Sequence, residues 1–200
     1  MSTTELFVEI LVIGVGAGIW LTVLVLSLFG RSIASLDQLV SIPALLPIIA
    51  IIYVLGILTD RVSDILFDRL FVAAIRRKHY SEVKQEFDDR RTILVYSERL
   101  SQLLEYGRSK LRIVRGWALN FLLLLISLNL FLATQIMDNP LRTRISFFGN
   151  TLLLLLSFLC WYAWRSLIDT EYRKIKEQSE FLRSIGLAKT PKKSRSSKSD

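Results

Sequence analysis

Three aspartates follow one another at helical spacing directly after an apolar segment. Asp60, Asp64 and Asp68 lie four residues apart, so on an α-helix their carboxylates share one face and repel each other. Arg61 lies three residues before Asp64, but no Lys or Arg stands four residues after any of the three. The stripe therefore calls for a cation from another helix, a second subunit or a divalent metal ion. The interpretation that we favour, however, is an acidic face in contact with water at the membrane surface.

Such a stripe could do two kinds of chemistry. In an assembly of several subunits, the carboxylates would form acidic rings at a pore mouth, which favour cations. With a divalent metal ion they would support a lipid-modifying enzyme. The sequence has no phosphate-binding loop, no Rossmann glycine pattern and no Ser/His/Asp arrangement, and its single His excludes a histidine-based metal cluster within one chain. We expect no enzymatic activity, no cofactor and no metal.

Four segments of 20 to 22 residues contain no Asp, Glu, Lys or Arg, namely 10–30, 39–59, 116–137 and 145–164. As helices, each would extend about 30 Å, the thickness of the hydrocarbon core of a bilayer. The segments are continuously apolar and do not alternate as membrane strands do. We therefore predict an all-α membrane protein with four transmembrane helices and amphipathic cytoplasmic helical extensions.

The basic residues predict the orientation of these helices. The 60–115 connection carries 13 Lys or Arg and residues 165–200 carry 10, whereas the two opposite loops hold three. Positive residues near span ends stay in the cytoplasm, so we expect a multi-pass protein of the cell (inner) membrane with both termini cytoplasmic. Residues 1–9 contain no Lys or Arg, which favours a retained first span over a cleaved signal peptide. Glu9 is expected to be solvated at the interface.

The charge pattern divides the chain into five parts. They are a first transmembrane helix pair (1–59), a cytoplasmic helical region that we call the collar (60–115), a second transmembrane hairpin (116–168), an amphipathic helix (169–186) and a disordered basic tail (187–200). Within the collar we predict one helix from residue 82 into the third span. Its apolar stripe, formed by Ile93, Leu100, Leu104 and Leu111, is expected to cover an apolar face formed by Val62, Leu66, Leu70 and Ala73.

Small and amide residues in the spans predict close helix packing. Gly14 and Gly18 are four residues apart in the first span, a spacing that lets a second helix approach closely. Asn120 and Asn129 in the third span and Asn150 in the fourth are expected to bond across helix interfaces.

Basic and aromatic residues at the predicted cytoplasmic interface favour contact with lipid headgroups. They are Arg108, Lys110, Arg112 and Arg115 before the third span, and Trp161, Trp164 and Arg165 at the end of the fourth. We expect the lipid bilayer, and anionic lipids in particular, as partners, and we do not expect nucleic acid.

Three functions are compatible with these features. The first is a non-enzymatic oligomeric scaffold or sensor that recruits or signals to a soluble cytoplasmic partner through the collar. Its basis is that amphipathic helices cannot bury their apolar faces alone. The second is an oligomeric channel or pore-forming effector, gated by the collar in a stress or defence pathway. The third is the metal-dependent lipid-modifying enzyme based on Asp60, Asp64 and Asp68.

Overall fold

The computed structural model describes residues 3–30, 42–135 and 140–186, which are almost entirely helical and contain no strand. The elements, in chain order, are α1 (Thr3–Phe29), α2 (Ile42–Phe67), the π-helix η3 (Asp68–Val72), α3 (Ala73–His79), α4 (Val83–Tyr96), α5 (Glu98–Gln135) and α6 (Pro140–Ser184). Four helical stretches are long and apolar enough to cross a membrane: α1, α2 with its continuation to His79, α5 and α6. The predicted all-α class with four such helices is therefore confirmed.

The two longest helices join the apolar segments to the charged part of the chain without interruption. Helix α5 begins within the collar and continues through the third apolar segment, and α6 continues past the fourth to Ser184. Gly186 then adopts a φ of +75°, the left-handed conformation in which glycine commonly follows a helix end. The tail predicted to be disordered, 187–200, lies outside the described residues.

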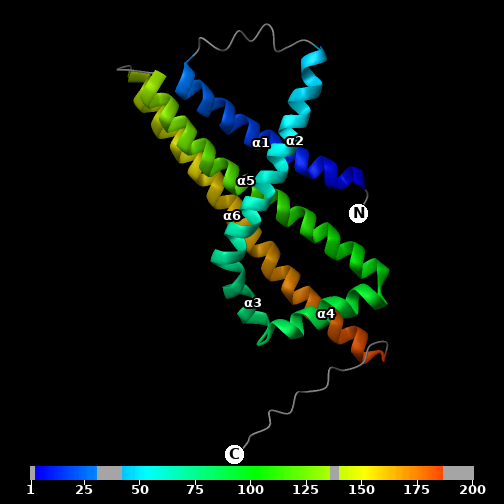
Figure 1. Ribbon diagram of the computed structural model, residues 1–200. Helices are drawn as coiled ribbons and strands as arrows, with labels where there is room; N and C mark the ends of the chain where they lie inside the picture. Colours follow the sequence, from blue (N-terminus) through cyan, green and yellow to red (C-terminus); the bar gives the residue numbers. More distant parts are fainter. Residues whose placement is uncertain (1–2, 31–41, 136–139, 187–200) are drawn as a thin grey trace, which may run out of the picture.

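The upper part of the molecule is built on the α5–α6 hairpin, against which α1 packs along α5 (Figure 1). Helix α2 crosses α1 at a steep angle (Figure 1). At this crossing a Cβ on Gly14 would lie 1.9 Å from the Ile52 carbonyl oxygen, and one on Gly56 would lie 2.1 Å from the Ile10 carbonyl oxygen. The two backbones are thus in direct contact, which requires residues without a side chain at both positions.

The largest buried core lies in the lower part, where the collar packs against α6 (Figure 1). The Trp164 side chain is 2% exposed. Its ring centroid lies 4.8 Å from that of Phe67 and 6.0 Å from that of Phe71. Helix α4 packs against α6 and adds the fully buried Ile93. Every member of the predicted stripe belongs to this core or packs against it, namely Ile93, Leu100, Leu104 and Leu111.

The predicted continuous helix from residue 82 is interrupted at Ser97, and this part of the prediction was wrong. The Ser97 backbone is extended, with φ −149° and ψ 103°. Its hydroxyl oxygen accepts a hydrogen bond from the Leu100 backbone N–H at 3.3 Å. Serine is a favoured helix N-cap because it satisfies such a free donor. The interruption separates α4 from α5 and lets α4 pack against α6.

The predicted apolar face of the collar was also wrong, because it points outward. Val62 and Leu66 are 55% and 39% exposed, whereas Ser63 and Phe67 are buried. The cause is that Asp60 turns toward α5, where it forms ion pairs. Residues two and six positions further along the helix then lie on the opposite side. Leu70 is likewise exposed, and Ala73 is partly exposed.

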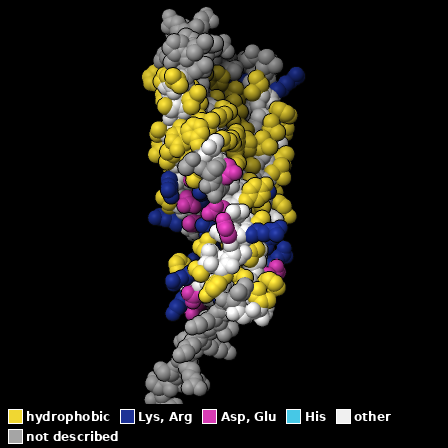
Figure 2. Space-filling model, turned by 90° about the vertical axis from the view of Figure 1, so that its right-hand side faces the viewer, with side chains coloured by type: hydrophobic (Ala, Val, Ile, Leu, Met, Phe, Trp, Pro, Cys, Tyr) yellow, Lys and Arg dark blue, Asp and Glu magenta, His cyan; other side chains and the backbone are white. Residues whose placement is uncertain are grey.

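The surface separates into two zones. Figure 2 shows mostly hydrophobic side chains over the upper part of the molecule, with a basic side chain near its top, and most of the charged side chains from mid-height downward. Large apolar residues of α2 and α6 are exposed in the upper zone, for instance Leu46 at 75% and Phe147 at 76%. Such a surface is unsuited to water and suits a hydrocarbon environment.

Candidate functional site

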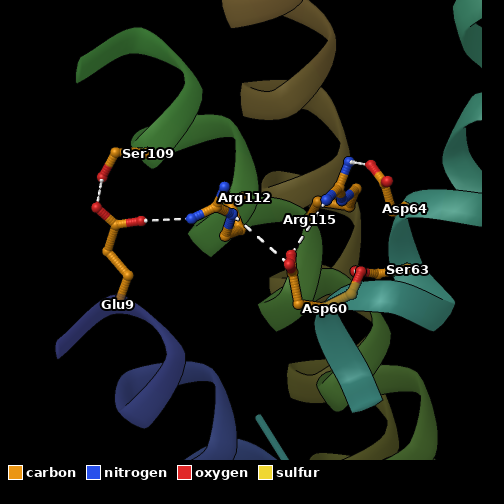
Figure 3. A network of polar contacts seen from close by, with 7 residues as sticks. All are labelled: Glu9, Asp60, Ser63, Asp64, Ser109, Arg112 and Arg115. Atoms are coloured by element: carbon orange, nitrogen blue, oxygen red, sulfur yellow. Dashed lines mark hydrogen bonds and ion pairs between the residues drawn. The ribbon is translucent and has the colours of Figure 1, made fainter. Parts of the chain in front are cut away.

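A polar cluster lies where the apolar segments end, between α1, α2 and α5 (Figure 3). We call it the junction network; it comprises Glu9, Asp60, Ser63, Asp64, Ser109, Arg112 and Arg115. It brings together residues that are up to 106 positions apart in the chain. The helices reach this point from three separate segments, so the network ties the apolar segments to the collar.

Two arginines of α5 link the carboxylates of α1 and α2 (Figure 3). Arg115 Nη2 donates to Asp60 Oδ1 at 3.1 Å, and Arg115 Nη1 donates to Asp64 Oδ1. Arg112 Nη1 donates to Glu9 Oε2 at 3.1 Å, and its Nε lies 3.6 Å from Asp60 Oδ2. Asp60 therefore lies between both guanidinium groups, and the ion pairs form one continuous chain from α1 to α2.

Two hydroxyl groups complete the network. Ser109 Oγ donates to Glu9 Oε1, and Ser63 Oγ donates to the Asp60 backbone carbonyl at 2.9 Å. The Glu9 side chain is 7% exposed, and those of Arg115 and Asp60 are 12% and 15% exposed. The expectation that Glu9 is solvated was therefore wrong: the packing of α1 on α5 covers its carboxylate, and Arg112 and Ser109 satisfy it.

The cations that the acidic stripe required come from another helix of the same chain. Asp60 and Asp64 are paired with arginines, while Asp68 forms no ion pair within the described residues. In the part of the chain that the structure describes, no group of three or more His, Cys, Asp or Glu is arranged to hold a metal ion. Two of the three predicted carboxylates are therefore already neutralised inside the monomer.

A second set of ion pairs joins α4 to α6 in the lower part. The Asp89 side chain is 1% exposed and accepts a hydrogen bond from Arg183 Nη2. Arg90 donates to Glu86 and to Glu171, both at 3.0 Å. Burial and the nearby Asp89 carboxylate raise the pKa of the Tyr80 hydroxyl, so this group stays neutral at physiological pH. Sequence reasoning missed these pairs, although the Glu86–Arg90 spacing was visible as an i,i+4 pair.

Within the apolar zone, all three predicted asparagines bond across helix interfaces. Asn120 Nδ2 donates to the Ile13 carbonyl oxygen at 2.9 Å, and its Oδ1 accepts from Trp20 Nε1 at 3.2 Å. Asn129 and Asn150 donate to one another's carbonyl oxygens at 2.8 and 3.0 Å. The first amide joins α1 to α5, and the second pair joins α5 to α6.

The glycines that permit the closest approaches differ in part from those predicted. Gly14 lies at the α1–α2 crossing, but a Cβ on Gly18 would meet only Ile52 Cγ1 at an ordinary 3.7 Å. Gly16 and Gly116 were missed: a Cβ on Gly16 would lie 2.5 Å from Asn120 Nδ2. A Cβ on Gly116 would lie 2.9 Å from a side-chain carbon of Ile13. The sequence signal was present, since Gly16 belongs to the same small-residue run.

The residues predicted to contact headgroups fall into two groups. Trp164 is buried in the core, and Arg112 and Arg115 form ion pairs with carboxylates of the same chain. The prediction that these three side chains contact lipid headgroups was therefore wrong. The other four side chains contact neighbours on the surface. Arg108 is 54% exposed and lies beside Glu171. Lys110 Nζ lies 4.3 Å from the Tyr106 ring centroid, and the Arg165 guanidinium lies 5.6 Å from the Trp161 ring centroid.

No protein-family model, curated protein or solved structure matches this chain.

Proposed function

We propose that this chain is a non-enzymatic membrane scaffold or sensor that recruits a soluble cytoplasmic protein, or a second copy of itself, through the collar. The junction network carries this proposal. Its mostly buried ion pairs hold α1, α2 and α5 together at the point where the collar begins. A change in the arrangement of the spans would therefore be transmitted to the collar, and binding to the collar would act on the spans.

The outward face of α4 supports a binding role for the collar. Val83, Phe87 and Leu94 lie on one side of this helix and are 59%, 67% and 54% exposed. A different side of the same helix carries Asp89 and Ile93, which are buried. An exposed apolar face next to charged residues is typical of surfaces that bind other proteins.

The pairing of Asp60 and Asp64 with arginines favours this scaffold over an ion pore. Carboxylates that already pair with arginines inside one chain are not available to line such a pore.

Native mass spectrometry in mild detergent tests the proposal. We expect the purified full chain to occur as an oligomer or with a partner protein in fixed stoichiometry. The Val83→Ala/Phe87→Ala variant should lose that species. Phe147→Ala/Phe148→Ala is the matched control, because it removes exposed apolar area from the upper zone instead. A wild-type chain that is strictly monomeric and carries no partner protein would overturn the proposal. Equal losses in both variants would show that the outward face of α4 is not the binding surface.

A further inference from the structure

A basic groove lies between α3 and α6, just beyond the last apolar segment. Its volume is about 320 Å³ and its polar lining comprises Lys78, Tyr162, Arg165, Ser166 and Asp169. Arg165 follows directly after the fourth charge-free segment, 145–164. The groove therefore lies at the level where a bilayer surface would meet the protein, if the chain is placed in the membrane as proposed above.

The cations of this groove retain donors that the described part of the chain does not use. Arg165 forms no ion pair within the described residues, and its guanidinium is positioned by the Trp161 ring. Lys78 Nζ donates to Asp169 Oδ1 at 3.0 Å, and His79 Nε2 lies 2.8 Å from the same oxygen. An ammonium group has three donors, so Lys78 has two more. Even with the Asp169 carboxylate counted, Lys78 and Arg165 leave the groove net positive.

The surface of α6 directly above the groove is apolar. Leu155, Phe158 and Leu159 are 51%, 57% and 49% exposed, and they lie on the same side of the helix as Tyr162 and Ser166. This arrangement is complementary to a phospholipid. The exposed apolar strip matches the acyl chains, and the groove with its two cations and two hydroxyl groups matches the phosphate. Phosphate oxygens accept strongly from guanidinium and ammonium groups, and these bonds are charge-assisted.

We propose that this groove binds a phosphate group, that of an anionic phospholipid whose acyl chain lies along the Leu155–Tyr162 side of α6. Lys78 and Arg165 donate to the phosphate oxygens, Ser166 and Tyr162 add hydroxyl donors, and Asp169 holds Lys78 in place. This inference rests on the membrane placement in the proposed function. It adds a lipid site that is separate from both the junction network and the outward face of α4.

The test measures lipid retention by the purified full chain in mild detergent, using native mass spectrometry. The probes are phosphatidylglycerol and a diacylglycerol with the same acyl chains, which lacks the phosphate. We expect phosphatidylglycerol to be retained in preference to diacylglycerol. The Lys78→Gln/Arg165→Gln variant should weaken its binding about tenfold. Lys84→Gln/Arg91→Gln is the matched control, because it removes one Lys and one Arg from exposed positions on α4. Its binding should stay within about twofold of wild type.

A second variant covers the case in which the double variant fails to fold. Ser166→Leu fills the groove without changing the charge, and it should also weaken the retention of phosphatidylglycerol. Equal retention of both lipids, or equal losses in the groove and control variants, would overturn the site. Displacement of the lipid by inorganic phosphate at matching concentration would overturn the lipid assignment in favour of free phosphate. The same spectra report protein partners separately, so failure of the lipid site is distinguishable from failure of the scaffold.

Discussion

The helices of the apolar zone and those of the lower zone pack through different interactions. In the apolar zone, helices meet through backbone contact at glycines and through asparagine amides. In the lower zone, they meet through an aromatic core and through ion pairs. The difference follows from the surroundings proposed for each zone. Lipid chains offer no hydrophobic drive for helix association, so close packing and polar bonds must supply it. Water drives the burial of large aromatic side chains.

The junction network lies between these two zones and differs from both. It uses charged groups as the lower zone does, but these groups lie at the ends of the apolar segments of α1, α2 and α5. Because its arginines come from one helix and its carboxylates from two others, it fixes three helices at once. Substitutions in these three regions should therefore lower the free energy of unfolding of the detergent-solubilised protein by different amounts.

The largest loss is expected in the aromatic core. Trp164→Ala removes a fully buried indole that packs against Phe67 and Phe71. It should lower the free energy of unfolding by about 3–5 kcal/mol, because a cavity remains. Tyr162→Ala, two residues earlier on the exposed side of α6, is the control and should cost less than about 0.5 kcal/mol. Similar losses in both variants would contradict the placement of Trp164 in the core.

The junction network comes second. Arg115→Gln leaves the Asp60 and Asp64 carboxylates without their shared guanidinium and should cost about 3 kcal/mol. Arg173→Gln breaks an exposed pair with Glu177 and should cost less than about 1 kcal/mol. Introducing Asp64→Asn into Arg115→Gln should restore part of the stability, because within the described residues Asp64 pairs with Arg115 alone, whereas Asp60 keeps Arg112. A double variant less stable than the single one would argue against the pairing.

The helix crossing in the apolar zone should respond to a single methyl group. Gly14→Ala places a Cβ against the Ile52 carbonyl oxygen, so α1 and α2 must separate, at a cost of about 1–3 kcal/mol. Gly18→Ala, one turn along the same helix, meets only ordinary contact distances and should leave the stability unchanged or slightly higher. Equal stability of the two variants would contradict the backbone contact between α1 and α2 at Gly14.

The smallest effect is expected for the amide pair of the apolar zone. A double-mutant cycle with Asn129→Ala and Asn150→Ala should yield a coupling energy of about 1 kcal/mol. The same cycle applied to Asn150 and Asn120, which are not bonded to each other, serves as the control and should be additive. Additive losses in both cycles would show that the reciprocal hydrogen bonds contribute nothing.

Much of the apolar zone could be predicted from the sequence because its signals are local. A run of 20 apolar residues indicates a spanning helix wherever it packs. An asparagine in such a run needs a partner, so Asn120, Asn129 and Asn150 could be singled out without knowing which helix each would meet. The continuity of α5 with its apolar segment could be predicted in the same way from the absence of proline, although Gly107 and Gly116 lie within the helix.

The charged zone was harder to predict because its signals depend on tertiary packing. The spacing of Asp60 and Asp64 showed that a cation was missing but could not identify Arg115, 51 residues away. Glu9 resembled an ordinary interfacial carboxylate until α1 was placed on α5. Trp164 fitted the pattern of an interfacial aromatic as well as that of a core residue, and composition alone does not separate the two.

The continuity of α6 has a mechanical consequence. Ser184 lies 20 residues beyond Trp164 on the same helix, which is about 30 Å along the axis. A tilt of α6 by about 5° relative to α5, pivoting at Trp164, would move its far end by about 3 Å at that rise per residue. That displacement is as long as a hydrogen bond, and Arg183, at this far end, bonds the buried Asp89 of α4. Such a tilt would therefore be large enough at the far end of α6 to break the hydrogen bond between Arg183 and Asp89.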